Sequence, residues 1–321
     1  MSHRQVMEAG GFTVVSRRGS RREPPRPPAA APHQPSFPYR RQGGPAENAA
    51  GALAAGALAA LAERVPAAEA ELRASSLWSH LLSLLRAGPP FRSIVCLGVG
   101  NFADHAGARY QMALALLLRE RLLLAASPRA TTGSAAASGG ASGASGGSDS
   151  SEGGTLPLSV YDPVLTSTEL EYARSRGCTV PAVNEEGRVH VDEHALFFMP
   201  HCAKQLYCNV LAANYGRDGL QRVVVLGNSF DSYMQVLSSG RRDAEAAWSH
   251  MARLAPFVRE ETCDQTLGVG DYGNAFNNLS VHSFAPGTLP AAKDDFWLRP
   301  FSAPPADAEV IGRLIDVAGA P

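Results

Sequence analysis

Three small residues that follow an apolar run could bring the backbone close to a ligand. Gly98, Gly100 and Ala103 fit the pattern G-x-G-x-x-[G/A], with Asn101 inside the same turn. Glycines at these positions permit a tight turn, and the amides at the start of the following helix favour an anionic or ribosyl ligand. The pattern therefore indicates either a nucleotide or S-adenosylmethionine site, or a tight turn with a purely structural role.

Asp162 is a candidate for holding the ribose hydroxyls of such a ligand. In a dinucleotide-binding sheet, an acidic residue does this about 20 residues after the glycines. Asp162 comes 62 residues after Gly100, and 34 after it when the 28-residue stretch 127–154 is left out. Because Pro163 follows, a turn-forming Asp-Pro is the competing interpretation.

His201 and Cys202 stand side by side after another apolar run, where a helix N-terminus would lower the pKa of a thiol. Adjacent residues rarely face each other productively, and Cys208 does not share a helical face with Cys202. Neither a Cys-His nucleophile nor a zinc site is therefore favoured. His201 is expected to line a crevice, to cap the helix or to be a structural histidine. Asn228 and Ser229 either cap their helix or contact a ligand, and no catalytic residue or metal ligand is assigned.

All of these residues follow apolar runs that have the character of buried parallel strands. Helical periodicity lies between the runs, and strands that alternate with helices form parallel sheets with right-handed crossovers. The sequence therefore predicts an α/β fold, a Rossmann-like parallel sheet flanked by helices, whose strand ends share one rim. The strand segments are 93–97, 158–161, 178–183, 195–199 and 222–226, the helices about 106–126, 167–175, 203–214, 230–238 and 244–253, and two further extended segments 262–265 and 279–284.

Composition divides the chain into four parts. Residues 1–50 form a basic, Pro-rich arm, 51–88 a helical lead-in, 89–300 the α/β domain and 301–321 a tail. The arm and the Ser- and Gly-rich insert 127–154 have too little apolar surface to offset chain entropy. Both are therefore predicted to be disordered.

Composition and charge exclude several classes of protein. With 45% hydrophobic residues among 321, the chain can build a sizeable core. No apolar run approaches the roughly 20 residues that span a bilayer, and no apolar stretch follows a basic N-terminus, so neither a membrane protein nor a secretory signal is expected. The net charge of −1 argues against nucleic-acid binding except through the arm, where eight Arg face two Glu over 1–41. That arm is a solvated tail, a nuclear-import patch or an RNA contact.

The five cysteines form no C-x-x-C pair. In a chain without a secretory signal, such cysteines are expected to be reduced and mostly buried. The predicted location is the cytoplasm, with the nucleus as a second compartment.

Five segments, most of them at these strand ends, resemble the Sensitivity to Red Light Reduced family of SRR-like proteins. The resemblance covers about 90–284, and the order of its M-P-H-C and G-N-S-F blocks is specific. The segments are C-L-G-V-G-N-F (96–102), R-Y-Q-M-A-L-A-L-L-L (109–118), Y-D-P-V-L-T (161–166), L-F-F-M-P-H-C (196–202) and V-V-V-L-G-N-S-F (223–230).

The resemblance implies a regulatory role and supplies no reaction or catalytic residue. Plant members are tied to circadian rhythm and light signalling, animal members to clock-gene expression and haem synthesis, and fungal members to microtubule-related phenotypes. The positions carried over as candidate site residues, without assigned chemistry, are Gly98, Gly100, Asn101, Asp162, Pro200, His201, Cys202, Gly227, Asn228 and Ser229.

The leading hypothesis is a non-catalytic regulatory protein of circadian rhythm and haem biosynthesis that binds a small ligand at the strand ends. Neither a cofactor nor a protein partner is identified by the sequence. The alternative is a nucleotide- or S-adenosylmethionine-dependent enzyme on the same Rossmann-like fold. A third hypothesis is direct haem binding through His201 or Cys202, which no Cys-Pro pair supports.

Overall fold

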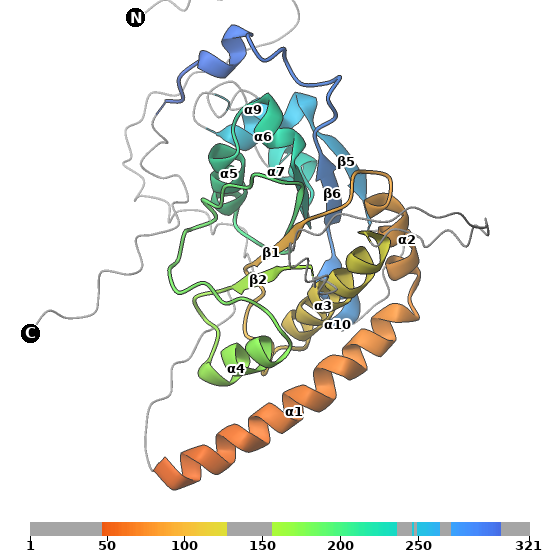
Figure 1. Ribbon diagram of the computed structural model, residues 1–321, viewed down its shortest axis with the longest axis vertical. Coiled ribbons are helices and arrows are strands. Elements are labelled where there is room, and N and C mark those ends of the chain that lie inside the picture. The colour runs from red at the N-terminus through yellow and green to blue at the C-terminus, as the bar shows by residue number, and fades with distance from the viewer. Residues whose placement is uncertain (1–46, 127–155, 236–245, 247–248, 264–270, 303–321) are drawn as a thin grey trace, which may run out of the picture. The chain divides into compact units, whose positions relative to one another are not determined.

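Short apolar runs of the chain form the centre of a six-stranded sheet with helices on both faces (Figure 1). The computed structural model describes residues 47–126, 156–235, 246, 249–263 and 271–302, all within one unit that spans 46–321. The strands are β1 (Ser93–Leu97), β2 (Leu158–Tyr161), β3 (Ala195–Met199), β4 (Val223–Asn228), β5 (Arg259–Thr262) and β6 (Leu279–Ser283). The α-helices are α1 (Glu47–Arg73), α2 (Ser76–Leu85), α3 (Ala106–Ala126), α4 (Ser167–Ser175), α5 (Lys204–Ala213), α6 (Arg217–Gln221), α7 (Phe230–Gln235), α9 (His250–Leu254) and α10 (Asp271–Phe276).

The strand order is β2-β1-β3-β4-β6-β5. The first four strands are parallel, whereas β6 runs antiparallel to both β4 and β5. The predicted α/β class is therefore confirmed, and the sheet is mixed, with an antiparallel pair at one edge. β1, β3 and β4 are buried along most or all of their length, because helices cover both faces of the sheet.

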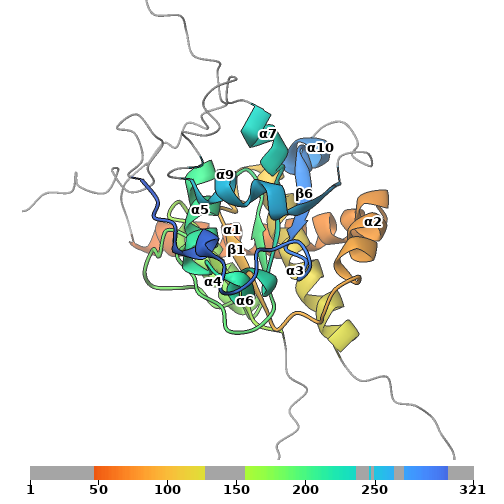
Figure 2. The same ribbon diagram turned by 90° about the horizontal axis from the view of Figure 1, so that it is seen from above.

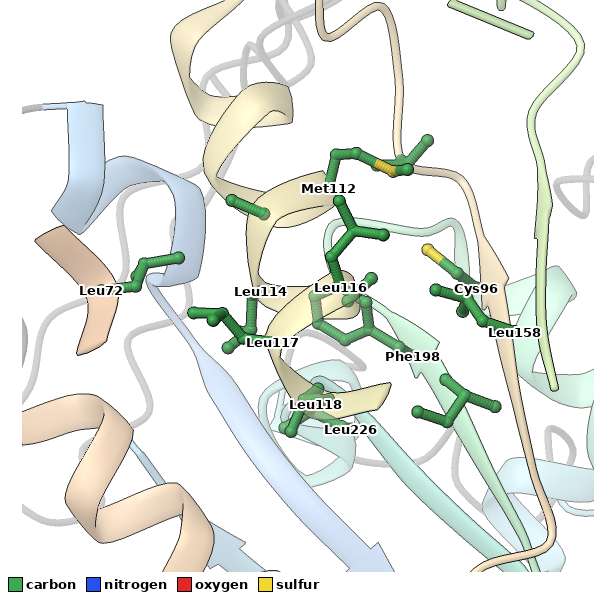
Figure 3. Close-up of a cluster of buried hydrophobic side chains, with 14 of the residues drawn as sticks. Leu72, Cys96, Met112, Leu114, Leu116, Leu117, Leu118, Leu158, Phe198 and Leu226 are labelled. Carbon is green, nitrogen blue, oxygen red and sulfur yellow. The ribbon is translucent and has the colours of Figure 1, made fainter. Parts of the chain in front are cut away.

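Successive residues of each central strand contribute to two different cores. Cys96 and Phe198 face a core shared with α1, α2, α3, α4 and α10, and Figure 3 shows the helix α3 residues that pack there. Leu97 and Phe197 face a second core shared with α5, α6, α7 and α9. The two helical layers can be followed in Figure 2, where α2 and α10 lie apart from α5 and α9.

The helical lead-in predicted before the sheet is present as two helices. Ser75 caps α2 by accepting a hydrogen bond from Trp78 N at 3.1 Å, and the buried residues of this helix, on one apolar stripe, are Leu77, Trp78, Leu81, Leu82 and Leu85. Helix α1 packs on α3 and α4, and Arg176 at the end of α4 pairs with Glu69 of α1 at 2.7 Å. No helix among the described residues combines the length and the apolar composition that crossing a bilayer requires.

Some expected boundaries differ from those observed. The candidate strand 178–183 is reduced to a single parallel bridge between Thr179 and Ser159, because the chain turns away from the sheet at Pro181 and leaves Val183 69% exposed. Residues 47–50, expected in the arm, begin α1. The rest of the arm, nearly all of the tail and the insert 127–154 lie outside the described residues, so the division into domains stays a prediction.

Candidate functional site

The strand order brings the ends of four parallel strands to one edge of the sheet. β2, β1, β3 and β4 are neighbours in that order, and parallel strands end at the same edge. Residues 98–101 therefore lie between Asp162, which follows β2, and residues 200–202, which follow β3; Asn228 ends β4 beyond them. We call these strand-end residues the rim.

The turn after β1 requires glycine at two positions. Gly98 and Gly100 have φ values of 68° and 73°, in the left-handed region that a β-carbon disfavours. A Cβ on Gly98 would also lie 2.5 Å from Sγ of Cys202, so the ends of β1 and β3 touch here. Asn101 closes the turn, because its Oδ1 accepts a hydrogen bond from Asp104 N at 2.9 Å.

Asp162 fastens this turn to the end of β2. Its Oδ2 accepts a hydrogen bond from Gly100 N at 2.8 Å, and its Oδ1 accepts one from Val164 N at 3.0 Å. Burial raises the pKa of the Asp162 carboxyl, and the two amide hydrogen bonds offset part of that rise. The Asp-Pro turn does form, and it places the carboxyl group against the glycine turn.

His201 occupies a strained turn at the end of β3. Its φ of 56° is uncommon for a residue with a side chain. The amide donates to Asn228 Oδ1 at 2.7 Å, and ring Nε2 lies 3.0 Å from Asn274 O. A carbonyl only accepts, so Nε2 carries a proton in this arrangement. The side chain connects the rim to α10 and does not cap α5, whose N-cap is Ala203.

The thiol of Cys202 is buried and donates to Leu97 O at 3.3 Å. Burial raises its pKa, and the charge of Asp162 adds to that rise. A thiolate is therefore disfavoured, which argues against a nucleophile here. In the part of the chain that the structure describes, no group of three His, Cys, Asp or Glu side chains could hold a metal ion.

Asn228, at the end of β4, forms hydrogen bonds with the residues that follow β3. Its Oδ1 accepts a hydrogen bond from the His201 amide, and its Nδ2 donates one to Tyr233 Oη at 3.2 Å. Its own amide donates to Tyr207 Oη at 2.9 Å. Ser229 Oγ accepts an amide from the first turn of α7 at 3.0 Å, which is the capping role. Neither tyrosine was singled out from the sequence.

A buried carboxyl group that the sequence did not indicate also holds the glycine turn. Glu169 Oε1 accepts a hydrogen bond from Ala103 N at 2.8 Å, and Oε2 accepts from the amide and hydroxyl of Thr166 at 2.7 and 2.8 Å. Thr166 and Glu169 form a capping box at the start of α4. The Thr-x-x-Glu spacing signals such a box, but not the contact with Ala103, 66 positions earlier.

A second polar pair, of a buried histidine and a partly exposed glutamate, lies behind the end of β4. His282 of β6 has Nδ1 3.2 Å from Val225 O and Nε2 3.5 Å from Glu260 Oε2 on β5. Burial works against ionisation of Glu260, but hydrogen bonds with His282 and Ser229 outweigh it and lower the pKa of this carboxyl to about 2. The pairing depends on antiparallel β6, which no local sequence pattern predicts.

A small hollow lies on the α5 side of the sheet, over β1 and β2. Its lining includes Leu97, Tyr161 and residues of the loop 181–189, and it encloses about 60 Å³. Leu97 and Tyr161 immediately precede Gly98 and Asp162. One end of the hollow therefore borders the rim.

The rim is also the topological switch point of the sheet. The chain leaves β1 towards α3 in one helical layer and leaves β3 towards α5 in the other. In open α/β sheets, ligands bind in the crevice outside the strand ends at this point. In this structure the turns that follow β1 and β3 touch at Gly98 and Cys202, and the small hollow lies instead over β1 and β2.

Comparison with known proteins places most of the sheet in one family model. The model described as "SRR1 domain" matches residues 74–283, from the junction of α1 and α2 to the end of β6. No solved structure was found to match the chain.

Three curated relatives resemble this chain over parts of their length. "Protein SENSITIVITY TO RED LIGHT REDUCED 1" of Arabidopsis thaliana is 30% identical over 210 residues, 65% of this chain and 64% of that protein. An "SRR1-like protein" of Mus musculus is 34% identical over 49% of this chain and 51% of its own length. One of Drosophila melanogaster is 30% identical over 43% and 47%. The chain thus spans between about half and two thirds of the relatives that it matches.

Proposed function

This chain belongs to the SRR1 domain family, and from that premise we propose that it is a non-catalytic regulatory protein of circadian rhythm that binds a small ligand at its rim. The proposal includes control of clock-gene expression and of haem biosynthesis, in the cytoplasm and the nucleus. The Arabidopsis relative is named for sensitivity to red light, which supports a connection with light signalling.

One observation carries the choice of binding over catalysis. The rim side chains that could move a proton or attack a substrate are already held by the protein. The Asp162 carboxyl group accepts hydrogen bonds from two backbone amides, and His201 Nε2 lies within hydrogen-bond distance of a backbone carbonyl. The Cys202 thiol is buried, and its pKa is raised. A general base or nucleophile needs a group that can reach the substrate in the right protonation state.

A rescue experiment tests the regulatory role. In cells that lack the protein and carry a clock-gene reporter, the wild-type chain is expected to restore the period of the rhythm and the level of haem. Gly98→Val is expected to fail, because it closes the turn at the rim, whereas Gly56→Ala, in open space on α1, is expected to rescue. Full rescue by a stably expressed Gly98→Val would contradict a role for the rim.

A thermal-shift screen tests ligand binding directly. Haem, NAD and S-adenosylmethionine are added separately to the purified full chain. A ligand present at about 100 times its Kd is expected to stabilise the fold by roughly 2.7 kcal/mol. If none of these compounds raises the melting temperature, the cofactor hypothesis loses its support, and direct haem binding with it.

The strand order favours a second candidate, a nucleotide- or S-adenosylmethionine-dependent enzyme on a Rossmann-like fold. The bridge at Thr179 lies beyond β2 and can be counted as the third parallel segment in chain order, with β3 and β4 as the fourth and fifth. Across the sheet these segments then follow the order third, second, first, fourth, fifth, which is that of a nucleotide-binding sheet. Antiparallel β6 then lies between β4 and β5. Transfer of the methyl group of S-adenosylmethionine to an acceptor nucleophile in a cell extract, measured as release of S-adenosylhomocysteine by the wild type and lost in Asp162→Ala, would favour this candidate over the regulatory one.

A further inference from the structure

The last described segment of the chain packs on the α5 side of the molecule through aromatic side chains. Residues 291–302, which we call the strap, follow the residues that the family model matches and are drawn in dark blue in Figure 1. The ring of Phe296 meets that of Phe257 edge to face, and the ring of Trp297 meets that of Tyr215, each with centroids 5.2 Å apart. The strap therefore covers a surface formed by the loop after α5 and by the turn after α9.

The end of the strap is recognised by two side chains of α9. The His250 imidazole stacks on the Phe301 ring with centroids 3.7 Å apart, and the guanidinium carbon of Arg253 lies 3.5 Å from the centre of the same ring. The guanidinium also donates to Arg299 O at 2.7 Å and to Pro300 O at 2.9 Å. Such charge-assisted hydrogen bonds and cation–π contacts are favourable. α9 therefore binds a phenyl ring together with the two backbone carbonyls that precede it.

The backbone of the strap has the conformation in which proline-containing peptides are commonly bound. Arg299 has φ of −64° and ψ of 123°, and Pro300 follows it, which is close to the polyproline II conformation. Extended segments of this kind dock on grooves lined by aromatic side chains, because little conformational entropy is lost on binding. The strap lies on its surface as such a peptide would.

The strap is attached less firmly than the strands and helices that it covers. None of the described residues 291–302 is buried, and no backbone–backbone hydrogen bond joins them to the rest of the described chain. Besides the contacts of α9 and the aromatic rings, Tyr215 Oη donates to Phe296 O at 3.4 Å. Segments with few buried apolar contacts open at a low cost in free energy. The strap can therefore leave its surface while the sheet stays folded.

We propose that Tyr215, His250, Arg253 and Phe257 form a peptide-binding site, which the strap occupies until an extended segment of a partner protein replaces it. The partner segment carries a phenyl ring directly after a proline and a second aromatic ring four residues before the first, because the strap presents these groups to the site. None of the four residues belongs to the rim, so this inference is independent of ligand binding there.

A fluorescent peptide with the sequence of residues 292–302 tests binding in trans to the full chain. The variant Phe301→Ala, whose own strap lacks the ring, is expected to bind this peptide at least about tenfold more tightly than the wild type, as measured by fluorescence anisotropy. In the wild type the tethered strap competes at a local concentration of about 1 mM. A peptide with alanine in place of the phenylalanine is expected to bind the same variant at least about tenfold more weakly.

Two further variants separate the site from the rest of the strap. Leu298→Ala changes a strap side chain that is 80% exposed, so this chain is expected to bind the peptide as weakly as the wild type. Adding Arg253→Ala to Phe301→Ala removes the contacts with the ring and with both carbonyls. The double variant is therefore expected to bind the peptide at least about tenfold more weakly than Phe301→Ala alone.

A second measurement keeps Phe301 in place and does not depend on the folding of the Phe301→Ala variant. All five native cysteines are buried, so a dye can be attached selectively to Leu298→Cys. Unlabelled peptide at a concentration of about 10 mM, above the local concentration of the strap, is expected to displace the strap and to lower the anisotropy of the dye. The peptide with alanine in place of the phenylalanine is expected to leave the anisotropy unchanged.

The outcomes decide between a replaceable strap and a fixed one. Peptide binding to Phe301→Ala that is as weak as to the wild type, or an unchanged anisotropy of the dye, would overturn the proposal. Dimers of the wild type that are lost in Phe301→Ala, measured by analytical ultracentrifugation, would identify the strap of a second copy as the occupant and overturn the assignment to a partner protein. The regulatory function is judged separately by the rescue with Gly98→Val.

Discussion

The two glycines of the turn after β1 differ in what a methyl group would meet. Both have positive φ, which costs a residue with a β-carbon about 1–2 kcal/mol. At Gly98 the added Cβ would lie 2.5 Å from Cys202 Sγ, whereas at Gly100 it would lie 3.6 Å from the Ala108 side chain, an ordinary contact. Gly98→Ala is therefore expected to lower the free energy of unfolding by about 1–3 kcal/mol more than Gly100→Ala, as measured by urea denaturation.

Gly56→Ala is the control for glycine replacement in general. It lies within α1 with open space around it, so the substitution is expected to be neutral or to stabilise by up to about 1 kcal/mol. Equal losses in Gly98→Ala and Gly100→Ala would show that the contact with Cys202 does not limit the turn.

The bond between Asn228 and His201 holds a strained residue in place. Asn228→Ala removes the acceptor of the His201 amide and the donor to Tyr233 Oη. A loss of about 1–3 kcal/mol in unfolding free energy is expected. His201→Gly removes the strain of a positive φ, so it is expected to recover part of the loss in the double variant. Additive effects in that double-mutant cycle would contradict the coupling.

The elements most visible in the sequence were the buried parallel strands. Continuous apolar runs mark β1, β3 and β4 because helices cover both faces of the sheet. The same rule places polar residues at the strand ends, so the rim could be located, including Asp162 despite its long separation from Gly100. These inferences need only local patterns and the geometry of a parallel sheet.

The pairing of β5 and β6 at the antiparallel edge of the sheet could not be predicted from local sequence patterns. β5 has the sequence Arg-Glu-Glu-Thr, without apolar alternation, and its residues are intermediate or exposed. Its place is fixed by pairing with β6 and not by its own side chains. Contacts such as Glu260 with His282 and Ala103 with Glu169 depend on which distant segments become neighbours.

The pair of Glu260 and His282 on these edge strands makes stability depend on pH. The pKa of Glu260 falls from 4.5 to about 2 in the folded chain. Its ionised form therefore stabilises the fold above about pH 4.5, and this contribution, at most about 3 kcal/mol, is lost as the pH falls towards 2. Glu260→Gln is expected to flatten the pH dependence of the urea midpoint between pH 5 and 2.

Glu261→Gln is the matched control on the same strand. Among the described residues, this side chain forms an ion pair with Arg259 in which both side chains are partly exposed, and such pairs contribute little. The pH dependence of the urea midpoint of Glu261→Gln is expected to follow that of the wild type. A Glu260→Gln profile that also overlies the wild type would show that the carboxyl group is not stabilised by His282.

At the scale of the whole molecule, the cysteines report on both cores at once. All five are buried. Cys96, Cys178 and Cys263 belong to the core on the α3 side, and Cys202 and Cys208 to the core on the α5 side. The two cores share one sheet, so we expect them to unfold together and to expose their thiols in a single transition.

Thiol titration with Ellman's reagent measures this directly. Burial raises the pKa of Cys96, Cys178 and Cys202, so the native chain is expected to react slowly and the chain in guanidinium to react at all five positions. Ser83→Cys, at an exposed position on α2, is the positive control and is expected to add one rapid equivalent. Thiols that become reactive in two steps, three in one and two in the other, would show that the two helical layers separate before the sheet unfolds.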